Sequence, residues 1–363
     1  MRPENALPPG FDPADWKRPP HTAWALRNVA RFLPLAAVSA GAGRPLASAP
    51  EALDLDAYLD LVHASSALVV RDGRLVYEAY RLGAEADDRH MVFSITKSIV
   101  GLVALMLIDD GTIDPDRPAE AFLPELAGSA FARATLARLL AMRDGVPFDE
   151  TYADPAADIH RYSRHYWGTA PGGTLAALAQ LPARPAREGR FAYRTPAADL
   201  IGWILRRATG TPLARLVSAR LWAPLGAEAD AAMTLDTAGV EIGGTGFCAR
   251  PRDLARLAAL LLAGGGGVVP ERVVAGLFAG GDRSAFAQPA YASRPGWSYH
   301  GLWWHMGGAR IAALGVHGQR LMLDRASGTA LIVTAAAPFV DSRALDPIHA
   351  RCFAQLTEGA GPA

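Results

Sequence analysis

The sequence predicts an α+β protein in which helices flank an antiparallel sheet and a helical lobe adjoins it. Two β-rich runs flank Asp72-Gly73 and two more flank residues 325–328, so hairpins are expected toward both ends of the chain. Between them, residues 115–224 contain several helical patterns and few strand patterns. Strands at both ends with helices between them are typical of an antiparallel sheet covered by helices.

The expected elements divide the chain into three parts. The first is a mostly irregular extension, rich in Pro, Ala and Gly, with Trp16 and Trp24 as anchors. The second is an α/β domain that contains the antiparallel sheet, and the third is a helical lobe. The expected bounds are 1–50 for the extension, 51–114 and 225–363 for the α/β domain, and 115–224 for the lobe.

The α/β domain is expected to begin with an amphipathic helix, because apolar side chains recur at helical spacing over residues 51–64. The hairpin around Asp72-Gly73 follows over residues 66–80. A long apolar helix then starts near Ser94 and ends near Gly111, since glycine is common just after helix ends.

The later elements follow from the same periodicities. A leucine-rich pattern that opens with Pro and Asp predicts a helix, and a run of four glycines ends it. That run is not a phosphate loop, because no Gly-Lys-Ser/Thr follows it. The predicted segments are helices at 135–142, 172–181, 196–210 and 251–263, a hairpin at 318–337, and a closing helix at 346–357.

The charge balance favours a small-molecule ligand. Basic and acidic residues number 36 each, so the formal net charge is zero. Nucleic acids and anionic membranes attract proteins with a basic surface excess, so neither is an expected partner. The longest apolar run, residues 99–108, is about half as long as a membrane span and predicts a buried helix.

The two cysteines, Cys248 and Cys352, are far apart in sequence and are not spaced like metal ligands. We favour two reduced thiols in a cytoplasmic protein over a disulfide. The first residues lack a basic segment followed by an apolar one, so no secretory signal is expected.

Ser94-Ile95-Thr96-Lys97 places a hydroxyl and an amine three residues apart at the start of the predicted helix. Residues i and i+3 share a helix face, so the Lys97 amine can reach Ser94. The helix dipole and the apolar surroundings disfavour an ammonium and should lower the Lys97 pKa. A neutral lysine can accept the serine proton, and the Ser94 N–H at the helix start can donate to an oxyanion.

This motif is short, and the alternative is that Ser94 caps the helix while Lys97 is a solvated first-turn residue. Two observations favour the catalytic interpretation. A cation is unfavourable in the first turn of a helix. Lysine also occurs only at Lys17 and Lys97, with arginine elsewhere, and lysine can lose its proton where arginine cannot.

Longer segments resemble the serine β-lactamases and penicillin-binding proteins, class C-type members in particular. The resemblance covers most of residues 65–340 and implies a β-lactamase/transpeptidase-like fold with Ser94 as the nucleophile. It is strongest to the 6-aminohexanoate-dimer hydrolases, or nylon-oligomer hydrolases, with family VIII carboxylesterases as near neighbours. The general resemblance rests on segments 88–98, 109–129, 134–146 and 243–262. The stronger one rests on segments 18–29, 36–41, 86–90, 123–129, 150–156 and 315–324.

The resemblance implies roles for two further motifs. Tyr193 occupies the tyrosine position of the family's Tyr-x-Asn, which implies that it helps to deprotonate Ser94 and relays a proton to the leaving group. It can do so if a nearby Lys⁺ lowers its pKa. Thr195 replaces the Asn, and residues 313–319 replace Lys-Thr-Gly without a lysine, which argues against β-lactams as substrates. The Val316 N–H is implied to be the second oxyanion donor.

Four residues are candidates for substrate contact. Tyr152 matches a tyrosine that contacts the substrate amide in the nylon-oligomer hydrolases. Trp303 and Trp304 resemble the paired tryptophans that flank that site, with core or edge aromatics as the alternative. His317 is a further candidate, although we favour a hydrogen-bonded structural histidine there.

No metal or other cofactor is expected. His160 and His165 are five residues apart, off the spacing of a helical metal pair, and the chain lacks the Gly-x-Ser-x-Gly of α/β-hydrolases. The expected function is a serine hydrolase that acts through an acyl-enzyme on short linear amides such as 6-aminohexanoate oligomers, with esters as side substrates.

Three alternatives stay open: a short-chain carboxylesterase, a penicillin-recognising sensor that is acylated without turnover, and a catalytically retired scaffold. The expected partner is a small-molecule amide or ester. The resemblance also implies a homodimer.

Overall fold

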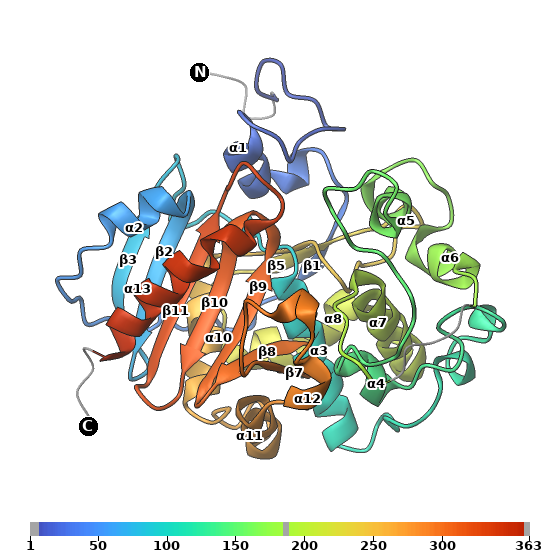
Figure 1. Cartoon of the computed structure of the whole chain (residues 1–363). Coiled ribbons are helices and arrows are strands. Elements are labelled where there is room, and N and C mark those ends of the chain that lie inside the picture. Colours follow the sequence, from blue (N-terminus) through green and yellow to red (C-terminus); the bar gives the residue numbers. More distant parts are fainter. Residues whose placement is uncertain (1–6, 184–188, 359–363) are drawn as a thin grey trace.

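A seven-stranded antiparallel sheet is the larger of two sheets in the described chain, and it lies on the opposite side of the molecule from the helices α5 (Asp158–Trp167) and α6 (Gly173–Gln180) (Figure 1). The structure is a computed structural model and describes residues 7–183 and 189–358. The expectation of no secretory signal concerns a segment that lies partly outside these residues. In sheet order, the strands are β3 (Arg74–Tyr80), β2 (Ala64–Arg71), β11 (Thr329–Ala335), β10 (Gln319–Asp324), β9 (Arg310–Gly315), β8 (Trp303–Gly307) and β7 (Ser298–His300).

Both predicted hairpins are confirmed. Asp72 and Gly73 have φ values of 48° and 74°, as a two-residue turn between right-twisted strands requires. The second hairpin joins β10 to β11 across residues 325–328. β2 and β11 then pair with each other, with Val69 opposite Leu331, so the two hairpins meet in the middle of one sheet.

Helices cover both faces of this sheet, in agreement with the predicted antiparallel sheet flanked by helices. α10 (Pro251–Leu262) and α11 (Glu271–Ala279) pack on one face, and α13 (Asp346–Glu358) packs on the other (Figure 1). The predicted helices at 251–263 and 346–357 are thereby confirmed to within one residue at each end. α3 (Ile95–Asp109) also contacts the sheet, and its nearly complete burial explains why it is apolar on all sides.

The segment 115–224 is helical, as predicted. Apart from isolated bridges, its described residues contain no β-strand. Because α3 packs against α7 as well as against the sheet, the division into domains stays a prediction. The helices here are α4 (Leu136–Leu140), α5 (Asp158–Trp167), α6 (Gly173–Gln180), α7 (Thr195–Thr209), α8 (Leu213–Val217) and α9 (Ala223–Leu225), with α12 (Arg283–Phe286) following later in the chain.

The described part of the N-terminal extension is mostly irregular, as predicted, but it also contains short regular elements that the sequence did not reveal. This segment forms α1 (Thr22–Arg27) and β1 (Leu35–Val38), and β1 is the edge strand of a second, four-stranded sheet. Strands of two to four residues are too short to show an alternating pattern in sequence. The order of this sheet is β1, β5 (Ala231–Thr234), β6 (Phe247–Ala249) and β4 (His90–Met91).

The helix predicted over 51–64 is also shorter than expected. α2 covers only Asp56–Leu61. The backbone N–H of Glu51 donates to the Val76 carbonyl of β3 at 2.8 Å, which holds the first residues of the segment in an extended form. At the other end, β2 already begins at Ala64.

Candidate active site

Ser94 lies at the start of α3, and Lys97 lies one turn further on, as predicted. The Lys97 Nζ is 2.7 Å from the Ser94 Oγ, and the Lys97 side chain is only 1% exposed. In the described chain, the Ser94 hydroxyl makes no capping bond to the helix. The alternative of a helix cap followed by a solvated lysine is therefore wrong.

Burial controls the protonation of Lys97. Removal from water lowers its pKa to about 8, although the negative charges of Glu150 and Asp199 act in the opposite direction. The Nζ also donates to the Gly244 carbonyl at 2.6 Å. A substantial fraction of Lys97 is therefore neutral near pH 8 and can accept the Ser94 proton.

Tyr193 completes this cluster from the residues that precede α7. Its hydroxyl interacts with the Ser94 side chain, and its ring lies 5.1 Å from the Lys97 Nζ. The expectation that Lys⁺ lowers its pKa is wrong: burial, and then the charge of Glu150, raise the pKa well above the usual value. The phenol is therefore neutral, and it can donate a proton or relay one but not act as the resting base.

Glu150 is a residue of the candidate site that the sequence did not reveal. Its carboxylate accepts hydrogen bonds from the Thr195 N–H and hydroxyl, both at 2.6 Å, and from the Tyr152 hydroxyl at 3.0 Å. These hydrogen bonds hold the loop that carries Tyr152 against the start of α7, beside Tyr193. Glu150 and Thr195 are 45 positions apart in the sequence, so no local pattern could have identified this contact.

Asp199 is a second missed residue, located on α7. It accepts hydrogen bonds from the Tyr162 and Tyr166 hydroxyls and from the Gly244 N–H at 2.7 Å. Burial raises its pKa to about 6. Asp199 therefore holds the N–H of the same residue, Gly244, whose carbonyl accepts from Lys97.

A cavity of about 150 Å³ opens beside Ser94, and Tyr152, Val316 and His317 are part of its lining. Ser94 precedes the first turn of α3 and Val316 begins a short 3-10 turn after β9, so neither N–H belongs to an intrahelical ladder. Both N–H groups therefore suit the role of oxyanion donor that we predicted. A Cβ on Gly315 would lie 2.6 Å from the Val92 carbonyl oxygen, so glycine allows the two segments to approach closely.

The residues next to these two donors have unusual backbone conformations. Phe93 and His317 have φ values of 45° and 60°, a region that non-glycine residues rarely occupy. Their rings contact each other with centroids 5.2 Å apart. Such conformations persist where the surrounding structure enforces them, and they are frequent at active sites.

The His317 side chain makes the structural hydrogen bond that we favoured. Its Nδ1 lies 2.8 Å from the Ala337 carbonyl oxygen, and burial lowers its pKa. The Nε2 has no partner among the described residues, and the ring lines the cavity beside Ser94. A contact between His317 and the substrate therefore stays a prediction.

The paired tryptophans lie behind the cavity rather than in it. Trp303 is 1% exposed and its indole donates to the Ser98 carbonyl of α3, so the structure places it in the core and outside the described lining of the Ser94 cavity. Trp304 stacks on Tyr193 with ring centroids 5.4 Å apart. It supports a candidate catalytic side chain without lining the cavity.

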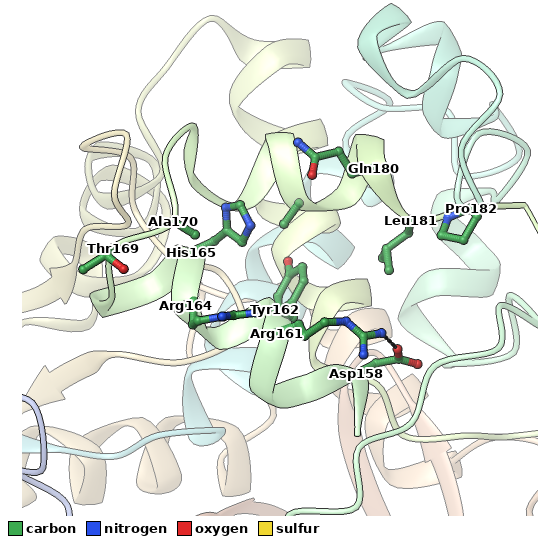
Figure 2. A pocket seen from close by; sticks show the side chains of 11 residues that line it. Asp158, Arg161, Tyr162, Arg164, His165, Thr169, Ala170, Gln180, Leu181 and Pro182 are labelled. Atoms are coloured by element: carbon green, nitrogen blue, oxygen red, sulfur yellow. Dashed lines mark hydrogen bonds and ion pairs between the residues drawn. The ribbon is translucent and has the colours of Figure 1, made fainter. Parts of the chain in front are cut away.

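A second and larger cavity, of about 370 Å³, lies between α5 and α6 (Figure 2). Figure 2 shows Arg161 and Asp158 paired at its edge. Its lining includes none of Ser94, Lys97 and Tyr193. We therefore identify the Ser94 cavity as the candidate active site.

The chain belongs to the beta-lactamase family, whose model matches residues 60–355. It is accordingly a hydrolase with the β-lactamase/transpeptidase-like fold, as predicted. It is 34% identical over 348 residues to the 6-aminohexanoate-dimer hydrolase of Paenarthrobacter ureafaciens, a match that covers 90% of this chain and 88% of that protein.

Two further comparisons extend this relationship. Esterase EstB of Burkholderia gladioli is 28% identical over 215 residues, which cover 50% of this chain and 53% of the esterase. A solved structure from Bacillus anthracis, assigned as a 6-aminohexanoate-dimer hydrolase, has a TM-score of 0.88 at 23% identity and covers 97% of this chain and 98% of its own. That likeness shows the fold.

Within residues 7–183 and 189–358, every helix is too short or too polar to span a bilayer. In the same part of the chain, no group of three or more His, Cys, Asp or Glu side chains is arranged to hold a metal ion.

Proposed function

We propose that this protein is a serine amidase that cleaves short linear amides of the 6-aminohexanoate-dimer kind, with carboxyl esters as side substrates. The observation that carries the proposal is the contact of Ser94 with both Lys97 and Tyr193 beside a cavity. The relative from Paenarthrobacter ureafaciens supports the choice of amide.

In the first step, neutral Lys97 accepts the proton of the Ser94 hydroxyl, and the Ser94 Oγ bonds to the substrate carbonyl carbon. The carbonyl oxygen becomes an oxyanion, to which the N–H groups of Ser94 and Val316 donate. Tyr193 donates its proton to the leaving nitrogen as the carbon–nitrogen bond breaks, and Lys97 returns a proton to Tyr193.

The acyl group is then bonded to Ser94. A water molecule gives one proton to Lys97 and attacks the acyl carbon, and the Ser94 oxygen leaves as the hydroxyl after it regains that proton. The free acid departs and the resting state is restored. Because the same groups serve both halves of the reaction, loss of either Ser94 or Lys97 should remove nearly all turnover.

The test is release of 6-aminohexanoate from its linear dimer by the wild-type protein, Ser94→Ala and Lys97→Ala. We expect wild-type turnover, with losses of about a thousandfold or more in both variants. Near-normal turnover by Lys97→Ala would contradict the role given to that lysine.

A p-nitrophenyl butyrate assay separates the alternatives. Ester hydrolysis without amide hydrolysis would identify a short-chain carboxylesterase, which the match to EstB favours as the second candidate. A burst that stops at one equivalent per chain would identify a sensor that is acylated without turnover. No reaction with either substrate would identify a retired scaffold.

We also propose a cellular location and an oligomeric state for the whole protein. Both cysteines have free, buried thiols, which supports a reducing, cytoplasmic location. A homodimer rests on the family resemblance, and light scattering coupled to size-exclusion chromatography would test it.

A further inference from the structure

The N-terminal segment contributes to the candidate active site. Trp16 is 3% exposed and packs against Phe93, the residue before Ser94, with parallel rings whose centroids are 6.1 Å apart. It also contacts Trp167 of α5, with ring centroids 5.4 Å apart. The next residue, Lys17, lines the same cavity as Ser94.

The ammonium of Lys17 rests on aromatic rings rather than on a carboxylate. Its Nζ lies 5.6 Å from the Trp16 ring centroid and 5.5 Å from that of Trp167. Among the described residues, Lys17 forms no ion pair. The nearby acid, Asp15, is 3.1 Å from the guanidinium of Arg18.

The remainder of the cavity does not neutralise this charge. Its described lining contains no Asp or Glu; the other titratable side chains there are Tyr152, His160, Tyr166 and His317. Burial lowers the Lys17 pKa, although the charge of Asp15 acts in the opposite direction, so the cation has lost part of its hydration. An anion in the cavity would replace it.

We infer that Lys17 is a substrate-binding residue that holds a carboxylate carried by the substrate at a distance from the bond that is cleaved. The inference deepens the proposed function and rests on it, since it specifies amides or esters that bear a free acid. A carboxylate fits better than a phosphate, because a single lysine matches one negative charge and the cavity is small.

The test compares charged and neutral esters of similar size. In one pair the charge is on the acyl side: mono-p-nitrophenyl glutarate and p-nitrophenyl valerate. In the other it is on the leaving-group side: 4-carboxyphenyl butyrate and phenyl butyrate. The variants are Lys17→Met, Lys17→Arg and, as the matched control, Arg18→Met, which removes a neighbouring cation whose side chain is 79% exposed.

We expect Lys17→Met to lower the ratio of kcat/KM for the charged over the neutral ester by about tenfold in at least one pair. Lys17→Arg should keep most of that ratio, and Arg18→Met should keep all of it. Equal losses on charged and neutral esters in both pairs, or no change at all, would overturn the inference and leave Lys17 as a packing residue.

Ser94→Ala is assayed with the same four esters, so that the two proposals can fail separately. If Ser94→Ala still hydrolyses them, the proposed function is wrong. If hydrolysis depends on Ser94 but the ratios do not depend on Lys17, only the inference about the carboxylate is wrong.

Discussion

At the residue scale, the proposed mechanism makes the reactivity of Ser94 depend on the protonation of Lys97. Only the neutral amine accepts a proton, and burial places its pKa at about 8. We therefore expect kcat/KM for ester hydrolysis to rise as the pH increases through about 8 and to level off above it. Initial rates between pH 6 and pH 10 would check this, and a flat profile across that range would contradict it.

Glu150 provides a second prediction at this scale. Its charge raises the pKa of Lys97, so Glu150→Gln should lower that pKa and move the rising part of the pH profile to lower pH. Glu125→Gln, which changes an exposed partner of Arg207, is the matched control and should leave the midpoint in place. A midpoint that moves upward in Glu150→Gln would show that lost hydrogen bonds outweigh lost charge.

The residues of the site differ in how far the sequence could identify them. Ser94 and Lys97 are three apart on one helix, so periodicity alone brought them together. Tyr193 and Val316 could be placed only through the family resemblance. The positions of Glu150 and Lys17 depend on contacts between distant segments, which no local pattern encodes.

At the element scale, the close approach of the chain before α3 to the end of β9 brings the two proposed oxyanion donors together. Gly315 has a φ of −127°, which any residue can adopt, so the effect of a substitution there is purely steric. We expect Gly315→Ala to force apart Val92 and β9 and to lower kcat by about tenfold or more, because a displacement of 1 Å has such effects.

Gly276→Ala is the matched control for this substitution. Gly276 lies in α11, and a Cβ there would meet only the His300 side chain at an ordinary 3.5 Å. Alanine is the better helix former, so this variant should keep its activity and its stability. Unchanged kcat in Gly315→Ala would show that the two segments can separate without harm to the site.

Helices and strands could be predicted from the sequence where a characteristic turn or a long helical repeat of apolar residues marked them. Asp72-Gly73 identified a hairpin because its left-handed turn suits those residues. β1 and β4 are short and pair with distant strands, so their sequences carry no usable alternation. The helix expected over 51–64 is shorter than predicted, because the first residues of this segment are extended and hydrogen-bond to the backbone of β3.

At the scale of the whole molecule, the N-terminal segment is part of the folded body. Trp16 packs against residues on both sides of the cavity, so Trp16→Ala should lower the free energy of unfolding by about 3–5 kcal/mol. Trp24→Ala, at a half-buried ring, should cost clearly less. Urea denaturation of the two variants would measure the difference, and equal losses would contradict the anchoring role of Trp16.

Reagents that react with lysine side chains would modify this protein at its cavity. The chain has two lysines: Lys97 is buried beside Ser94, and Lys17 is half-buried in the cavity lining. An activated-ester dye directed at amines therefore labels this cavity as well as the amino terminus, and attachment at the two lysines reports whether the cavity is occupied. Immobilisation through lysine would block the enzyme, whereas coupling through its carboxylates would leave the cavity open.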